Sequence, residues 1–206
     1  MGRPSVPKLT RDKIAAVALE LIDATGRFTI PELARRLDVQ PSSLYKHVSG
    51  RDEIVELVRE RIHAEGPEID VEAPWQEVVR QVATYYRDVW GRHPHFVPML
   101  AMSTVQAGAA MASVRNFALV LSRAGFDPHE TLMIMGTVDL LAFGGALDAG
   151  APDDIYAPET REQMNALGDA VRSVSSGAGR ADAVWAYSID LLIESLEQRL
   201  AAHAGT

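Results

Sequence analysis

Residues 29–51 read Thr-Ile-Pro-Glu-Leu-Ala-Arg-Arg-Leu-Asp-Val-Gln-Pro-Ser-Ser-Leu-Tyr-Lys-His-Val-Ser-Gly-Arg, and this stretch predicts two short helices joined by a tight turn. Thr29 is expected to cap the first helix, and Glu32, three residues later, completes a capping box. Asp38 tolerates the left-handed backbone of a tight turn better than most residues other than glycine. Pro41 suits the first position of a new helix, where its missing N–H costs nothing. The spacing therefore predicts a helix-turn-helix.

The second of these helices is expected to be short and to face outward. Only Leu44 and Val48, four residues apart, can anchor it to a core, and a capping box from Ser49 to Asp52 predicts the start of the next helix. The polar residues of the second helix are then left outside: Ser42, Ser43, Tyr45, Lys46 and His47. Hydroxyl, phenol, ammonium and imidazole groups suit phosphate oxygens and base edges. A tight helical turn with a polar outer face also occurs in helical proteins unrelated to DNA, and the motif alone leaves that alternative open.

From Ile14 to Leu57 the sequence resembles the DNA-binding domain of the TetR family of bacterial one-component helix-turn-helix repressors. The residues that carry the resemblance are Ala18, Leu21, Gly26, Thr29, Leu33, Ala34, Val39, Leu44, Tyr45, His47, Asp52 and Ile54. Four positions depart from the usual pattern: Asp38 for glycine, Gln40 for serine, Val48 for phenylalanine and Arg51 for lysine. The resemblance covers roughly the first 60 residues. It implies DNA contacts by Thr29, Arg36, Gln40, Pro41, Ser42, Ser43, Tyr45, Lys46, His47 and Arg51.

Charge is divided unevenly along the 206 residues. Residues 1–51 hold nine Lys or Arg against five acidic residues, a net charge of +4. The remaining residues hold 11 bases and 23 acids, a net charge of −12, so the total is −8. Because phosphate neutralisation supplies most non-specific affinity for nucleic acid, this asymmetry assigns double-stranded DNA to the N-terminal part. The acidic residues of the body are interpreted as a solvated surface.

Several other classes of protein are disfavoured. The chain has no cysteine, which removes disulfides, thiolate zinc sites and cysteine nucleophiles. His93 and His95 flank Pro94 with a spacing that fits no common metal site, and no phosphate loop, nucleophile elbow or zinc-protease motif occurs. The apolar run 131–147 is slightly short for a membrane span and has Asp139 at its centre, so a buried helix is expected. We therefore predict a cytoplasmic protein without cofactor, metal, membrane partner or enzymatic activity.

The predicted fold is all-α, with two parts. An N-terminal three-helix helix-turn-helix DNA-binding domain occupies residues 1–51, with a basic arm over residues 1–9. A larger helical domain for effector binding and dimerisation occupies residues 52–206. Outside the helix-turn-helix, helices are expected at about 10–24, 51–65, 75–91, 94–99, 104–124, 128–147, 158–174 and 181–202, because Pro and Gly punctuate the helical periodicity there.

A short recognition helix reaches few base pairs, so operator recognition normally needs two copies. The resemblance implies a homodimer in which the last two long helices of each subunit form a four-helix bundle. The residues expected at that interface are Gly136, Gly144, Trp185, Ile189, Leu192 and Leu196. The alternative is that these stripes pack only within their own subunit.

The resemblance also implies a pocket in the helical body for a small-molecule effector of unknown identity. The expected lining is Trp90, His95, Phe96, Met99, Met102, Gln106, Asn116, Phe117, Met135 and Asp139. Six of the seven methionines follow residue 98, and methionine suits an adaptable apolar cavity. A stripe of methionine and aromatic residues at helical spacing is more often plain core, and that alternative stays open for each residue.

The favoured hypothesis is a transcriptional repressor released from a palindromic operator by its effector. The alternatives are a DNA-binding architectural protein without effector and a helical protein unrelated to DNA.

Overall fold

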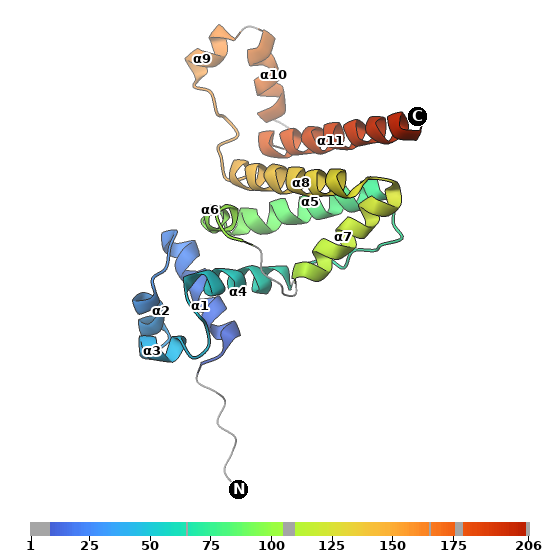
Figure 1. Ribbon diagram of the computed structural model, residues 1–206. Helices are drawn as coiled ribbons and strands as arrows, with labels where there is room; N and C mark the ends of the chain where they lie inside the picture. The colour runs from blue at the N-terminus through green and yellow to red at the C-terminus, as the bar shows by residue number, and fades with distance from the viewer. Residues whose placement is uncertain (1–8, 65, 105–109, 165, 176–178, 205–206) are drawn as a thin grey trace. The chain divides into compact units, whose positions relative to one another are not determined.

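The computed structural model describes residues 9–64, 66–104, 110–164, 166–175 and 179–204, and every regular element within them is a helix (Figure 1). In chain order these are α1 Arg11–Thr25, α2 Ile30–Arg36, α3 Pro41–Leu44, α4 Arg51–His63, α5 Trp75–Arg92, α6 Val97–Ala101, α7 Ala110–Ala124, α8 Pro128–Asp148, α9 Pro158–Gln163, α10 Ala166–Ser175 and α11 Arg180–Ala204. The predicted all-α class is confirmed. The predicted arm lies outside the described residues except for Leu9, which is buried.

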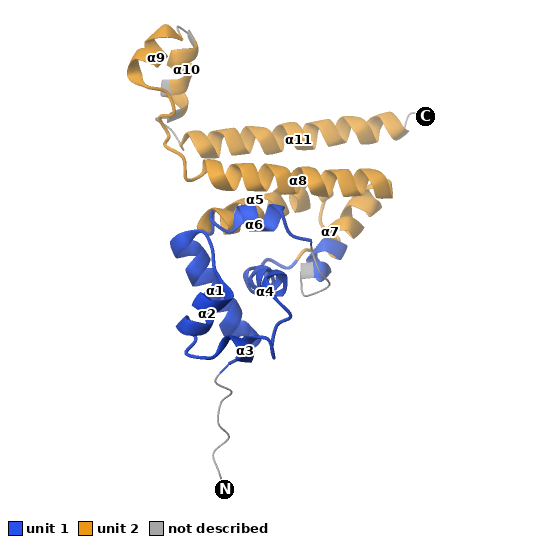
Figure 2. Ribbon diagram, turned by 60° about the vertical axis from the view of Figure 1, so that its left-hand side comes forward, with its two compact units in different colours: residues 1–68, 93–115 blue, residues 69–92, 116–206 orange. Residues whose placement is uncertain are grey.

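The chain divides into two compact units (Figure 2). Unit 1 comprises residues 1–68 and 93–115, and unit 2 comprises residues 69–92 and 116–206. In unit 1, α4 packs against α1 and α6, and α2 packs against α1 and α3. The predicted functional boundary between residues 51 and 52 stays a prediction; it falls inside α4, which belongs physically to unit 1.

Helix α1 begins and ends where its sequence signals lie. The Thr10 hydroxyl accepts a hydrogen bond from the Lys13 N–H at 3.1 Å, which satisfies one of the free donors at the helix start. At the other end Gly26 adopts a left-handed conformation with φ 74°, and its N–H donates to the Ile22 carbonyl at 2.7 Å. Ile14 and Ile22 are fully buried and give α1 the inner face that packs against α4.

The predicted helix-turn-helix is confirmed in its local geometry. The Thr29 hydroxyl accepts from the Glu32 N–H at 3.3 Å and so caps α2. Asp38 takes φ 55° in the turn, which makes it the one non-glycine residue with positive φ in the described part of the chain. Pro41 is the first residue of α3. The N-cap at Thr29, the turn at Asp38 and the helix start at Pro41 therefore correspond to features of the structure, and of the predicted capping box the Thr29 half is observed.

The predicted capping box from Ser49 to Asp52 is wrong. Helix α4 has Gly50 as its N-cap, which offers no capping side chain. The Ser49 N–H donates instead to Glu53 Oε2 at 2.6 Å. Because the N-cap is Gly50, one residue later than the predicted Ser49, the carboxylate that faces back to the turn is that of Glu53 rather than Asp52.

Unit 2 is built on α5, α8 and α11, which pack on one another. The three helices meet at Arg87 of α5, whose guanidinium lies 5.3 Å from the Trp185 ring centre and donates to Asp182 at 2.5 Å. On α8, a Cβ at Gly145 would come within 2.8 Å of the Trp185 ring. Gly145 therefore makes the room in which the α11 tryptophan stacks on the α5 arginine.

Three predicted helices differ in extent from those observed. Helix α6 begins at Val97 rather than Pro94, because the Phe96 N–H donates to the His93 carbonyl at 2.8 Å and closes a turn there. Helix α7 begins at Ala110, and residues 105–109 lie outside the described part. The predicted helix 158–174 is divided into α9 and α10, and Gly168 allows α10 to approach the Arg161 carbonyl, which a Cβ would meet at 2.3 Å.

Candidate nucleic-acid interface

Two buried side chains hold the recognition segment, residues 41–48, to unit 1. Leu44 is fully buried and Val48 is almost so. The helical turn continues past α3, since the His47 and Val48 N–H groups both donate to the Leu44 carbonyl, at 2.8 and 3.0 Å. The polar residues of the segment are exposed or half-buried: Ser42, Ser43, Tyr45, Lys46 and His47. Tyr45, with 56% of its surface exposed, is a large aromatic side chain left in solvent.

The other residues predicted to contact DNA are all exposed. They are Pro41, the first residue of the segment, and Thr29, Arg36, Gln40 and Arg51 outside it. The Arg51 guanidinium lies 5.3 Å from the centre of the Phe28 ring, a cation–π contact that orients it. Arg36 pairs with Glu20 at 3.8 Å, and both side chains are largely in solvent. Such a pair is weak and exchanges readily for a phosphate. The structure thus leaves every one of the ten candidates accessible, while their contacts with DNA stay a prediction.

A network that sequence reasoning missed fixes the end of the recognition segment. Arg11, the first residue of α1, donates from Nη1 to the His47 carbonyl at 2.9 Å and to Glu53 Oε1 at 2.5 Å. The second oxygen of Glu53 accepts the Ser49 N–H at 2.6 Å. One α1 residue and one α4 residue therefore hold the backbone on both sides of Val48.

The Glu53 carboxylate is stabilised in its charged form. Hydrogen bonds from the Ser49 N–H and hydroxyl and from Arg11 lower the pKa of Glu53 below its usual value, and partial burial opposes them. The hydrogen bonds favour the charged carboxylate because they are made to its oxygens. The network is therefore intact at neutral pH.

Three comparisons with known proteins bear on these features. An HTH-type transcriptional regulator of Saccharopolyspora erythraea is 30% identical over 145 residues, which are 68% of this chain and 57% of that protein. The tetracycline repressor protein class E of Escherichia coli is 25% identical over 157 residues, 72% of each chain. The crystal structure of the Streptomyces coelicolor TetR family protein ActR in complex with (S)-DNPA matches with a TM-score of 0.75 at 21% identity, covering 94% of this chain and 99% of that one.

The chain belongs to the TetR family. The resemblance first seen over residues 14–57 thus extends to the whole fold, because the structural match includes both units. No family model matches the sequence.

In this TetR-family chain the residues predicted to line an effector pocket are divided between the two units. Unit 1 holds His95, Phe96, Met99 and Met102, and unit 2 holds Trp90, Asn116, Phe117, Met135 and Asp139. Gln106 lies outside the described residues. His95 has a structural partner, the Asp23 carbonyl, at 2.9 Å from its Nδ1. Met102 is 89% exposed and Phe96 is fully buried, so these residues do not share one environment.

A cavity of about 450 Å³ lies within unit 1 beside the start of α4. Its lining combines charged, hydroxyl and apolar side chains: Arg51, Asp52, Val55, Pro98, Met99, Met102, Ser103 and Thr104. Arg59 donates from Nη2 at 2.5 Å to the hydroxyl of Ser103, which lines the cavity, and pairs with Glu56 at 3.1 Å. Arg59 and Glu56 are both buried, so this contact ties α4 firmly to the turn that follows α6.

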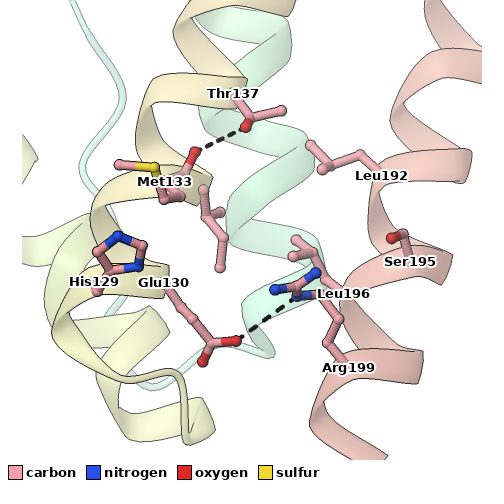
Figure 3. A pocket seen from close by; sticks show the side chains of 9 residues that line it. His129, Glu130, Met133, Thr137, Leu192, Ser195, Leu196 and Arg199 are labelled. Atoms are coloured by element: carbon pink, nitrogen blue, oxygen red, sulfur yellow. Dashed lines mark hydrogen bonds and ion pairs between the residues drawn. The ribbon is translucent and has the colours of Figure 1, made fainter.

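A second cavity, of about 240 Å³, lies between α8 and α11 in unit 2 (Figure 3). Figure 3 shows side chains of α8 and α11 facing each other across it, with Met133 and Thr137 on one side and Leu192 and Leu196 on the other. At one end the Glu130 carboxylate lies 3.7 Å from Arg199. The cavity therefore combines apolar side chains with the hydroxyls of Thr137 and Ser195 and has an ion pair at one end.

The residues predicted at a dimer interface fall into two groups. Trp185, Ile189 and Leu196 are buried within unit 2, and Leu192 is half-buried. Gly136 and Gly144 are exposed on α8, and a Cβ at either would meet no described atom within 4 Å. Their role in an interface stays a prediction.

The described residues include no cluster of three or more His, Asp or Glu side chains that could hold a metal ion.

Proposed function

We propose that this chain is a sequence-specific DNA-binding transcriptional regulator, a repressor that a small-molecule effector releases from a palindromic operator. The observation that carries the proposal is the recognition segment, which is anchored by Leu44 and Val48 and leaves Ser42, Tyr45 and Lys46 in solvent. Such a segment can enter a major groove, where lysine meets phosphate oxygens while serine and tyrosine reach base edges. The names of the relatives, a transcriptional regulator and a tetracycline repressor, support the same function.

A homodimer is part of the proposal, because α8 and α11 expose apolar stripes. On α8 the stripe comprises Leu132, Met133, Gly136, Leu140, Gly144 and Leu147, and on α11 it comprises Val184, Tyr187 and Leu191. These positions recur every three or four residues and form one face of each helix. A second copy of the chain would cover this face by two-fold symmetry and would supply the second recognition segment.

Membrane insertion is the competing explanation for the apolar character of α8. Within the described residues α8 is the one helix long and apolar enough to cross a membrane, and 28% of its most apolar window is buried. Asp139 lies exposed near the middle of α8, and a carboxylate there is costly in a bilayer. We therefore assign the exposed stripe to a protein partner and the chain to the cytoplasm, where DNA is available.

The proposed release by an effector requires contacts that connect the effector's binding site with the helices that carry the recognition segment. Helix α4 is held to the turn after α6 by the Arg59–Ser103 hydrogen bond, and the Ser103 hydroxyl donates to the Leu100 carbonyl at 3.1 Å. Because Arg59 is buried, a displacement of this turn would either move α4 or deprive the buried guanidinium of its hydrogen bond to Ser103, although its ion pair with Glu56 on the same helix would remain. An effector that binds one arrangement better than the other lowers DNA affinity by the same coupling factor.

The salt dependence of DNA binding tests whether Lys46 and Arg51 contact phosphates. We expect Lys46→Ala and Arg51→Ala each to reduce the slope of log affinity against log salt by about one, as the loss of one phosphate contact does. Arg123→Ala in unit 2 removes the same charge far along the sequence, where Arg123 pairs with Glu72, and should leave the slope unchanged. Unchanged slopes for both Lys46 and Arg51 variants would remove them from the phosphate contacts.

Sequence preference separates base reading from backbone contact. We expect Ser42→Ala and Ser43→Ala to change the preferred sequence more than the affinity for an unrelated duplex. Equal losses on all duplexes would assign both serines to the backbone. Wild-type binding that is indifferent to sequence and to every small molecule tested would favour the architectural alternative over the repressor.

A further inference from the structure

The recognition segment has few anchors of its own. In residues 41–48 only the side chains of Leu44 and Val48 are buried, and α3 has four residues. A helix this short gains little stability from its own hydrogen bonds, so its orientation depends on contacts made by other elements. The two anchors fix its inner face, but they do not fix the direction in which the chain leaves it.

Arg11 and Glu53 supply that direction. The Arg11 guanidinium donates to the His47 carbonyl at 2.9 Å, and the Glu53 carboxylate accepts the Ser49 N–H at 2.6 Å. These backbone groups flank Val48, and the two side chains are joined to each other at 2.5 Å. The backbone on either side of Val48 is thus held by hydrogen bonds to Arg11 and Glu53, while the Val48 side chain is buried in the core.

The chemistry of this contact suits a rigid grip. Arg11 uses one nitrogen for two acceptors, and Glu53 uses its two oxygens for two donors, so each partner is fixed in two directions. The hydrogen bonds are charge-assisted and therefore stronger than neutral ones. Glu53, with 22% of its side chain exposed, is more enclosed than an ordinary surface carboxylate.

A second ion pair between the same two helices offers a natural control. Asp12 of α1 pairs with Arg61 of α4, next to Arg11 in sequence but with the charges exchanged. In the described contacts this pair joins α1 to α4 without touching residues 41–49. A role in joining the helices is common to both pairs, whereas contact with the recognition segment belongs to Arg11–Glu53.

We infer that Arg11 and Glu53 are positioning residues, which act through the His47–Ser49 backbone to aim the recognition segment at base edges. This inference rests on the proposed DNA-binding function. It predicts that the pair sets sequence specificity rather than general attraction to DNA, because neither residue needs to touch a phosphate.

The first test measures the affinity of the full-length protein for its selected operator and for an unrelated duplex, over a range of salt concentrations. We expect Arg11→Met and Glu53→Gln each to lose roughly tenfold or more in operator affinity, the effect of one charge-assisted hydrogen bond, with little change on the unrelated duplex. The double variant should be no worse than either single one. Arg61→Met should leave the ratio of the two affinities unchanged.

Arg11→Lys keeps the charge but loses the planar guanidinium, so it should restore specificity only in part. A fall of about one in the salt slope of Arg11→Met, with Glu53→Gln binding as well as the wild type, would make Arg11 a direct phosphate contact and overturn the inference. Equal losses in Arg61→Met would overturn it as well, because the effect would then come from α1–α4 packing.

Amide hydrogen exchange in the absence of DNA tests whether Arg11 and Glu53 hold the backbone of residues 47–49. We expect the amides of residues 47–49 to exchange faster in Arg11→Met and Glu53→Gln than in the wild type or Arg61→Met. Unchanged exchange at Ser49 would overturn the inference even if the variants bind DNA poorly. The wild-type protein could bind no duplex while the exchange rates in the variants rose as expected. That result would support the contact of Arg11 and Glu53 with the backbone of residues 47–49 and would contradict the proposed DNA-binding function.

Discussion

The recognition segment of unit 1 exposes hydroxyl, phenol and ammonium groups, whereas the α8–α11 face of unit 2 exposes leucines, a tyrosine and a methionine. Polar groups lose little by facing water, but an apolar stripe gains free energy when it is covered. Tyr45 and Leu140 are both exposed. The neighbours of Tyr45 in the recognition segment are lysine and serines, whereas Leu140 belongs to a stripe of other apolar residues on α8. The first surface suits a polyanion and the second suits another protein surface.

The sharpest way to break this comparison is to place a charge on the apolar face. Leu140 is 73% exposed, so Leu140→Glu should leave the protomer folded and prevent its pairing. Because a dimer gains by binding two half-sites at once, operator affinity should fall by about 10²- to 10⁴-fold. Sedimentation gives the mass, and fluorescence anisotropy gives the affinity.

Leu119→Glu is the matched control, since Leu119 is an exposed leucine on α7 outside the stripe. A Leu140→Glu protein that remains dimeric and binds its operator normally would show that the face is not the interface.

The recognition segment can be tested from its inner side. Leu44 is fully buried, and Leu44→Ala should destabilise unit 1 by about 2–5 kcal/mol through lost burial and a cavity. Ser42→Ala, on the exposed side of the same segment, should stay within about 0.5 kcal/mol of the wild type. Urea denaturation measures both, and similar values for the two would mean that Leu44 does not anchor the segment.

The stability of unit 1 should depend on pH through His63 of α4. Burial, and secondly the charge of Arg59, lower the pKa of His63 to about 4 from an ordinary 6.5. The unfolded chain therefore takes up the proton first, and stability present above pH 6.5 is lost as the pH falls toward 4. The loss should be on the order of 2–3 kcal/mol.

Urea denaturation at pH 7, 6 and 5 measures this effect, with His63→Gln as the comparison. The variant should lack this part of the pH dependence. Parallel pH profiles for the two proteins would show that His63 is not the group responsible.

Two neighbouring glycines on α8 offer the smallest and most selective test. Gly145→Ala would place a Cβ 2.8 Å from the Trp185 ring and should cost about 1–3 kcal/mol of protomer stability. Gly144→Ala meets no described atom and should raise helix stability by up to about 1 kcal/mol. If the dimer helices approach closely at Gly144, the same change should weaken dimerisation; a tighter dimer would exclude that close approach.

Local signals in the sequence predicted the helix-turn-helix well. Thr29, Asp38 and Pro41 each act on the backbone within a few residues of themselves, so their effects are read from neighbours in the sequence. The same reasoning failed at α4, where Ser49 looked like an N-cap. A glycine cap with a carboxylate reaching back from Glu53 is a different solution to the same need, and spacing alone does not distinguish them.

Long-range contacts explain what the sequence did not reveal. Arg11 reaches His47 and Glu53 across 36 and 42 positions, and no periodicity signals such a pairing. The sequence predicts one apolar stripe on α11, through Trp185, Ile189, Leu192 and Leu196. In the structure Trp185 and Ile189 are buried in their own unit, while Tyr187 and Leu191 are exposed. A helix with two apolar faces gives no sign in its sequence of which face meets the same subunit.

The most direct measurement is the selection of duplexes by the purified protein from a random library, in moderate salt that suppresses non-specific binding. We expect a pseudo-palindrome whose half-site centres lie about 34–36 Å apart, or a multiple of that, as two recognition segments on one dimer require. Failure to enrich any sequence across salt concentrations, with and without candidate effectors, would contradict the assignment of residues 41–48 as a DNA reader.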